Sequence, residues 1–419
     1  MILLIFFIFF LLYALTRKSK SVAIIMILIQ IVSLCGTFFI GNDYPIDTFF
    51  KAFNLVITAI ILTLLIAPWI KVTNIKNIYV TNELKLKKMT YTLLILSFIP
   101  FIVLLPSAIF VHTLVDDINT FKYSEGVSLD FYYNILPVNV RAFILATYLY
   151  YFSYFLIPLH FYYLGKKNIR LAILCFIFSL NVILYGLTFF SRWVVVIYIL
   201  TYVSFFIILH NTVNQKLKKN VKVILIIVAI MSSIYFISTT SERFTDDRVY
   251  AATVPSQSKI KDPVLYSYLD YLSQWYDNSN FLLNHYEGNI FNGQISLQHV
   301  LSLLSRYNIV RYNTENFKLL RRELWPDKYW YSFNGFVAYS IYDYGYILSM
   351  ILILLYYCFM KKLRPKRNQI TLINLFILAL LIQLPLMAIF YSNVAGLIIP
   401  LLLIIPFILY LKVTFVRYS

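Results

Sequence analysis

Long apolar runs alternate with short polar links along almost the whole of this 419-residue chain. A helix that crosses a bilayer needs about 20 mainly apolar residues, and about 17 suffice. The pattern therefore predicts an all-α polytopic membrane protein with eleven spanning helices, near 1–15, 21–40, 52–70, 90–112, 142–164, 171–190, 193–209, 222–238, 340–360, 369–388 and 393–411.

The sixth and seventh of these helices lie in one nearly unbroken apolar run, 171–209. As a single helix this run would be about 58 Å long, roughly twice the hydrocarbon thickness of a bilayer. We expect the run to fold back on itself. The only charged break near its middle is Ser191-Arg192, where we place the turn.

One polar segment, 239–333, is far longer than the other links. Within it, residues 264–283 and 297–310 carry apolar side chains at roughly helical spacing. We expect both stretches to form helices on the outer membrane surface, with Tyr and Trp at the level of the lipid headgroups. The chain then divides into a membrane bundle of eight helices (1–238), a large external loop (239–333) and the last three helices (334–419).

The distribution of charge predicts which side of the membrane each link faces. The odd-numbered links and the C-terminal tail hold 22 of the 36 Lys and Arg residues but only one acidic residue, Glu83. The even-numbered links and the long segment, extended to Asp343, hold the other 17 of the 18 acidic residues. The positive-inside rule places the N-terminus outside, the C-terminus in the cytoplasm and the long segment outside.

Composition agrees with an integral membrane protein. Hydrophobic residues make up 61% of the chain and charged residues 13%, whereas soluble proteins carry about 25% charged residues. The net charge of +18 does not indicate nucleic acid, because it is spread over short clusters that flank helices and meet anionic lipid. The three cysteines lie in apolar runs, where we expect small hydrophobic side chains and no disulfide.

Familiar catalytic signatures are missing from the sequence. There is no glycine-rich phosphate loop, no HExxH, GxSxG or CxxC, and the five histidines lack metal-ligand spacing. We therefore expect neither a metal nor a cofactor. Arg192 is the sharpest single candidate, because an arginine in a tight external turn runs against the positive-inside bias and needs a partner near the hydrocarbon. The alternative is an arginine that snorkels to the headgroups.

Two further groups of external side chains are candidates. Guanidinium groups bind phosphate bidentately, and the candidate loop arginines are Arg243, Arg248, Arg306, Arg311, Arg321 and Arg322. A carboxylate, Asp343 or Asp247, would act as general base toward a sugar hydroxyl. The alternative readings are a solvated loop of balanced charge for the arginines, a helix-start acid for Asp343 and a simple turn for Asp247.

These residues resemble a known family. The stretch GLTFFSRWVVVIYI contains G-x4-S-R at 186–192, and FNGFVAYSIYDYGYI contains D-Y-G at 343–345. Together with about eleven helices and one large external loop late in the chain, they look like the bacterial oligosaccharide repeat-unit (O-antigen) polymerases of the Wzy type.

The resemblance implies a metal-independent membrane glycosyltransferase of the bacterial plasma membrane, active in O-antigen, lipopolysaccharide or capsule synthesis. It would move a growing glycan from undecaprenyl diphosphate onto a new lipid-linked repeat unit, in company with a chain-length regulator and other assembly proteins. The substrate-binding arginines that it implies are Arg192, Arg243, Arg248, Arg321 and Arg322, and the catalytic carboxylates that we pair with them are Asp343 and Asp247. Some family members have ten residues between a loop arginine and a glycine, whereas Arg322 and Gly335 have twelve.

Three other functions stay open, and one of them, a sensor or anchoring protein, would not need eleven helices. A glycosyltransferase that uses a polyprenyl-phosphate sugar usually carries acids in its first external loop, where this chain has Asp43 and Asp47. A lipid-linked oligosaccharide flippase would have charged spans and short loops on both sides. The nearly charge-free spans and the long external segment favour chemistry outside the membrane.

Overall fold

The computed structural model describes residues 2–17, 21–40, 52–114, 135–245, 254–325 and 333–412. Helix is present in each of the eleven predicted ranges, and strand is confined to two three-residue segments in the described part. Seven helices or helix pairs are long and apolar enough to cross a membrane: Ala23–Ile40, Ala52–Lys71, Glu83–Leu114, Val140–Gly165, Ile169–Thr188, Gly335–Leu363 and Val394–Lys412. Ile2–Arg17, Arg192–Ile208 and Leu372–Leu386 are shorter apolar helices. The fold is thus all-α with multi-pass membrane character, and the count of eleven spans stays a prediction.

The chain forms two compact units, each built from separate stretches of sequence. The first unit comprises residues 1–73, 244–364 and 381–399, and the second comprises 74–243, 365–380 and 400–419. From residue 244 onward, the described part of the long polar segment therefore belongs to the same unit as the first three helices. Each unit is considered by itself below.

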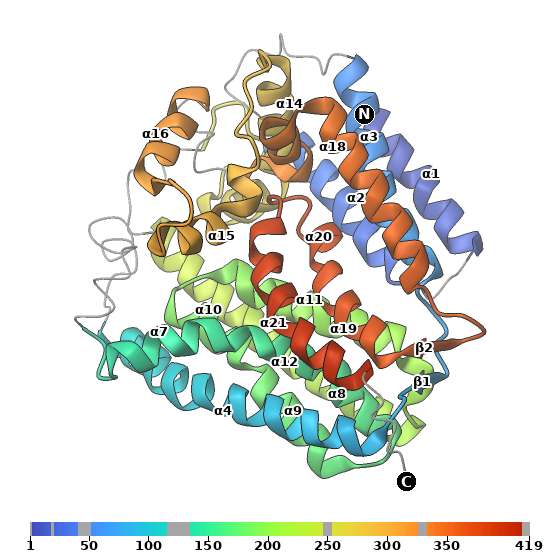
Figure 1. Cartoon of the computed structure of the whole chain (residues 1–419). Coiled ribbons are helices and arrows are strands. Elements are labelled where there is room, and N and C mark those ends of the chain that lie inside the picture. Colours follow the sequence, from blue (N-terminus) through green and yellow to red (C-terminus); the bar gives the residue numbers. More distant parts are fainter. Residues whose placement is uncertain are drawn as a thin grey trace. The chain divides into compact units, whose positions relative to one another are not determined.

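The first unit contains four long apolar helices. They are α1 (Ile2–Arg17), α2 (Ala23–Ile40), α3 (Ala52–Ile66) with its short extension η1 (Ala67–Lys71), and α18 (Gly335–Leu363). Figure 1 shows α1, α2, α3 and α18 side by side. The polar segment adds α14 (Pro263–Asn284), α15 (Gln294–Arg306) and α16 (Thr314–Leu324), and α20 (Gln383–Leu386) follows later in the chain.

Helix α14 confirms the helix predicted over 264–283, and it is packed deeply against α2. A side-chain carbon added to Gly36 would lie 1.9 Å from the Ser273 hydroxyl oxygen, so only glycine allows this approach. Trp275 is 1% exposed, and its indole N–H donates to the Ser33 hydroxyl. Small and polar residues at a close contact are typical of helix pairs in membranes, where the hydrophobic effect does not distinguish helix from lipid.

Two glycines with left-handed backbone shape α18. Gly335 begins the helix at φ +70°, and a carbon added to it would lie 2.8 Å from the Trp275 ring. Gly345 has φ +73° and ψ 173° and separates the helix into two parts. L-residues with a side chain rarely adopt these angles. The D-Y-G stretch therefore contains the break in α18.

The second unit is a larger set of helices with one small sheet. Helices α4 (Glu83–Leu114), α7 (Val140–Leu149), α8 (Ser153–Gly165), α9 (Ile169–Ser179), α10 (Asn181–Thr188), α11 (Arg192–Ile208) and most of α12 (Gln215–Thr245) come first, with 3₁₀ turns at η3 (Tyr150–Phe152) and η4 (His210–Thr212). Parts of α19 (Leu372–Leu381) and α21 (Val394–Lys412) complete it. Strand β1 (Asn77–Tyr79) pairs in parallel with β2 (Gln369–Thr371), with Asn77 opposite Gln369.

The break predicted at Ser191-Arg192 is observed. Helix α10 ends at Thr188 and α11 begins at Arg192. The Ser191 amide donates to the Gly186 carbonyl at 2.7 Å, and the Phe190 amide donates to the Leu187 carbonyl at 3.2 Å. With Phe190 at φ +47°, these bonds form a Schellman cap. Gly186 also lets Val195 approach within 3.1 Å of where a side-chain carbon would stand. The glycine and serine of G-x4-S-R thus build the turn.

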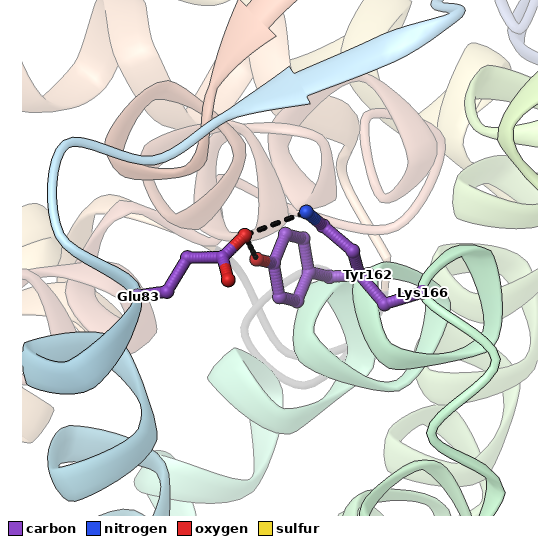
Figure 2. A network of polar contacts seen from close by, with 3 residues as sticks. All are labelled: Glu83, Tyr162 and Lys166. Atoms are coloured by element: carbon purple, nitrogen blue, oxygen red, sulfur yellow. Dashed lines mark hydrogen bonds and ion pairs between the residues drawn. The ribbon is translucent and has the colours of Figure 1, made fainter.

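Contacts between links in the second unit agree with the predicted alternation of sides. Lys166 donates to the Glu83 carboxylate at 2.6 Å, and the Tyr162 hydroxyl lies 3.5 Å from the same oxygen (Figure 2). The hydrogen bond to Glu83 raises the pKa of Lys166. This pair joins two links predicted to be cytoplasmic, as does the 2.8 Å bond from the Lys76 amide to the Asn368 carbonyl. The His112 ring lies 3.2 Å from the Leu187 carbonyl, so it joins the ends of two predicted helices that lead into links predicted to be external. The orientation itself stays a prediction.

A pair of glycine substitutions separates backbone strain from packing in the first unit. Gly335→Ala adds both a left-handed alanine, which costs about 1–2 kcal/mol, and an overpacked contact with Trp275, which costs about 1–3 kcal/mol more. Gly288→Ala is the matched control, because its φ is +91° and nothing lies within 4 Å of the added carbon. We expect the melting temperature of the detergent-purified protein to fall clearly more for Gly335→Ala. Equal losses would show that the contact with Trp275 contributes little.

Candidate functional site

Asp343, a predicted catalytic carboxylate, is fully buried at 0% exposure. Its Oδ1 accepts from the Ile295 amide at 3.0 Å and its Oδ2 from the Ser296 amide at 2.8 Å. These are two of the amides at the start of α15 that have no partner within the helix. The N-cap residue Gly293 supplies no side-chain cap, so Asp343 caps α15 from another helix. The carboxylate also suits the positive end of the helix dipole.

Two backbone hydrogen bonds also join α18 to the residues just before α15. The Gly293 amide donates to the Asp343 carbonyl at 3.0 Å, and the Phe291 amide donates to the Tyr342 carbonyl at 2.7 Å. The Tyr342 hydroxyl donates to the Leu282 carbonyl at the end of α14 at 2.9 Å. The polar segment is therefore tied to α18 at the D-Y-G stretch. In this arrangement Asp343 positions α15, and its role as a general base stays a prediction.

Arg321, a predicted substrate-binding residue, lies near the end of α16 against aromatic rings. Its guanidinium donates to the Tyr339 hydroxyl at 2.9 Å. The guanidinium carbon lies 4.7 Å from the centre of the Trp325 ring and 5.4 Å from that of Tyr339. Trp325 is fully buried and contacts Tyr342, the neighbour of Asp343, at 5.4 Å between ring centres. One tryptophan thus links two of the predicted site residues, Arg321 and Asp343.

The remaining predicted residues are exposed, belong to the second unit or lie outside the described residues. Arg322 is exposed, one residue after Arg321. Arg192 is the first residue of α11 in the second unit and is half-buried. Arg243 belongs to the last turns of α12, but its side chain is outside the described part of the chain. Asp247 and Arg248 lie wholly outside it, as do Asp43 and Asp47.

Between α15 and α16 lies a cavity of about 1010 Å³, which the sequence analysis did not predict. Its lining is mostly uncharged and polar: Asn292, Gln294, Leu301, Ser305, Asn308, Val310, Arg311, Tyr312, Asn313, Asn316, Phe317 and Leu320. The signal for it in the sequence is the set of asparagines between 308 and 316, which no spacing rule distinguishes from ordinary loop residues. The cavity belongs entirely to the first unit. It adjoins the Asp343 contact, because Gln294 directly precedes the amide that Asp343 accepts from.

No group of three or more His, Cys, Asp or Glu side chains that could hold a metal ion occurs among the described residues. Comparison with known proteins finds no matching family model, no matching curated protein and no matching solved structure. The resemblance to O-antigen polymerases therefore rests on the sequence alone, through its two motifs and its predicted architecture.

The capping role of Asp343 predicts a specific loss of stability. Asp343→Ala leaves two buried amides without an acceptor, at about 1–3 kcal/mol each. Asp262→Ala is the control, because Asp262 caps α14 in an exposed position by accepting from the Leu265 amide at 2.7 Å. Loss of an exposed cap costs about 1 kcal/mol. We expect Asp343→Ala to lower the melting temperature more and to speed amide hydrogen exchange in α15. Unchanged exchange in α15 would contradict the capping role.

Proposed function

We propose that the protein is a membrane glycosyltransferase that joins undecaprenyl-diphosphate-linked oligosaccharide repeat units on the outer face of the bacterial plasma membrane. The observation that carries the proposal is the way in which the polar segment and the apolar helices form one unit. The segment meets α18 at Asp343 and presents Arg321 on the aromatic cluster beside that contact. A cation fixed where an external segment meets a spanning helix suits a substrate with a lipid anchor and an anionic headgroup.

The proposed reaction has a defined flow of atoms and electrons. A hydroxyl oxygen of the incoming lipid-linked unit attacks the anomeric carbon of the growing glycan. The bond from that carbon to the undecaprenyl diphosphate breaks with both electrons on the diphosphate oxygen, and a base takes the hydroxyl proton. The products are a glycan longer by one repeat unit and undecaprenyl diphosphate, so no nucleotide sugar takes part in this step.

Arginines would stabilise the charge that develops on the departing diphosphate. The geometry of Arg321 favours this role, because stacking on Trp325 and the bond to Tyr339 hold the guanidinium plane in place before substrate binds. Arg192 is the second proposed arginine. As the first residue of α11 it stands at the positive end of a helix dipole, where a cation is disfavoured by about 0.3–1 kcal/mol. A substrate anion is a reason to keep it there.

The role of base falls to a carboxylate on the outer side. Asp343 and Asp247 remain the proposed residues. In its present contacts Asp343 accepts two backbone hydrogen bonds, so catalysis by this carboxylate requires the start of α15 to move away from it. The partners that we propose are the lipid-linked oligosaccharide, membrane lipid, and a chain-length regulator with other polysaccharide-assembly proteins.

Single arginine substitutions test the proposed charge stabilisation. We expect Arg321→Ala and Arg192→Ala each to slow polymerisation by roughly 10²–10³-fold, the effect typical of losing one such donor. Arg321→Lys keeps the charge but loses the planar fork, so its polymerisation rate should lie between those of the wild type and Arg321→Ala. Polymer length is read as a ladder on a gel after adding purified lipid-linked repeat units.

Arg170→Ala is the control for these variants, because Arg170 is exposed and lies in a link predicted to be cytoplasmic. It should give normal ladders. Ladders of normal length from Arg321→Ala or Arg192→Ala, at normal protein level, would remove that arginine from the site.

Two introduced cysteines test the proposed orientation. In a chain whose three native cysteines are replaced by alanine, Asn289→Cys should react with a membrane-impermeant maleimide in intact cells. Asn220→Cys should react only after lysis, because its link carries the cytoplasmic cluster of lysines. Both positions are exposed asparagines in the structure. Labelling of Asn220→Cys in intact cells would reverse the topology and place the polar segment in the cytoplasm.

A further inference from the structure

The cavity between α15 and α16 has a chemical character of its own. Within the described part of the chain, its twelve lining residues include five side-chain amides, one serine and one tyrosine, with Arg311 as the one cation and no carboxylate. A volume of about 1010 Å³ lies at the upper end of the range of about 300–1,000 Å³ for ligand pockets. The lining thus offers many hydrogen-bond donors and acceptors with little net charge.

Backbone geometry explains three of the five amides. Asn292 and Asn308 adopt left-handed φ angles of +53° and +57°, which asparagine tolerates better than most residues. Asn308 ends α15 where the sequence pattern had continued the helix to 310, and the Ile309 amide donates to the Leu304 carbonyl at 3.0 Å. Asn313 caps α16 by accepting from the Asn316 amide at 3.3 Å. These three residues shape the walls of the cavity.

No turn or helix cap explains the side chains of Gln294 and Asn316. Gln294 is the first residue of α15, and Asn316 lies in the first turn of α16. Neither side-chain amide has a hydrogen-bond partner within the described part of the chain. Each amide can both donate and accept. Two helix starts therefore present one unengaged amide each to the same cavity.

The Tyr312 hydroxyl is a stronger indication of a ligand. It is buried without a hydrogen-bond partner in the described residues, and burial raises the pKa of the phenol. The carbonyl of the same residue accepts from the Ser305 hydroxyl at 2.8 Å, and its ring lies 6.2 Å from that of Phe317. The residue is thus fixed in place while its polar end stays unsatisfied. A buried hydroxyl without a partner is unfavourable, so phenylalanine would be the more stable residue here unless a ligand supplies the partner.

We propose that this cavity binds the sugar rings of the oligosaccharide, away from its diphosphate. The lining amides and the Tyr312 hydroxyl match sugar hydroxyls, which also donate and accept. The apolar lining residues Leu301, Val310, Phe317 and Leu320 give sugar ring faces a surface to pack on. A diphosphate carries several negative charges and would need more than the single Arg311. The ligand class rests on the proposed function, whereas the site rests on the cavity itself.

The test measures glycan binding without polymerisation. Detergent-purified full-length protein, fluorescently labelled, is applied to an array of defined lipid-free bacterial oligosaccharides. We expect the wild type to bind a subset of them. Gln294→Ala, Asn316→Ala and Tyr312→Phe should each weaken that binding by roughly two- to twelvefold, the effect of losing one hydrogen bond. Tyr312→Phe should do so with an equal or higher melting temperature, which a structural role of the hydroxyl would not produce.

Matched controls lie next to the cavity. Gln298→Ala removes an amide one helical turn after Gln294, and Asn289→Ala removes an exposed asparagine of the same segment; neither residue lines the cavity. Both should bind as the wild type does. Inorganic pyrophosphate should not displace the glycan.

Three results would overturn the proposal: no binding to any oligosaccharide, binding that the three cavity variants leave intact, or displacement by pyrophosphate. Failure of the polymerase assay would refute the proposed function and leave this binding result standing. Polymerisation by a protein whose cavity binds no glycan would refute the cavity alone.

Discussion

The first unit depends on one buried carboxylate. A charged or polar group inside an apolar helix is unfavourable unless its hydrogen bonds are satisfied. Asp343 meets this condition by accepting from two amides at the start of α15, and those amides in turn lack partners of their own in the helix. Separation of α15 from α18 would leave the carboxylate and both amides without hydrogen-bond partners. The position of Gln294, and with it one wall of the cavity, follows from that bond.

Small and polar residues also make close contacts and hydrogen bonds between the other helices of the unit. Asn54 in α3 donates to the Leu283 carbonyl at 3.1 Å and accepts from the Tyr346 hydroxyl at 2.7 Å, which joins α3 to α14 and α18. Gly36 and Gly335 allow α2 and α18 to approach Ser273 and Trp275 of α14. These contacts make α14 an integral helix of the unit, although it lies in the polar segment. The polar segment is therefore part of the helix bundle, and in the proposed function the bundle holds this segment beside a lipid-anchored substrate.

Sequence could predict the helices because the signal for them is local. Run length alone located helix in all eleven ranges, and the impossible length of 171–209 located its turn. The site was different. Asp343 bonds with residues 47 and 48 positions away, and no spacing rule relates an acid in an apolar helix to a distant helix start. Arg321 and Arg322 are neighbours in sequence, but only packing distinguishes the residue held on Trp325 from the exposed one. The amides were visible, but their convergence on one cavity depends on how α15 and α16 meet.

In the two motifs that resemble the family, some residues are explained by the backbone and others only by their side chains. In G-x4-S-R, Gly186 is accounted for by the close turn between α10 and α11, and in D-Y-G, Gly345 is accounted for by the break in α18. Any chain with these turns would favour glycine at these positions, so the glycines support a fold and not a reaction. Arg192 is different, since the turn does not need a cation and the helix dipole disfavours one. In the proposed function, the functional part of G-x4-S-R is therefore that arginine, and the functional part of the loop is Arg321 and not its spacing to Gly335.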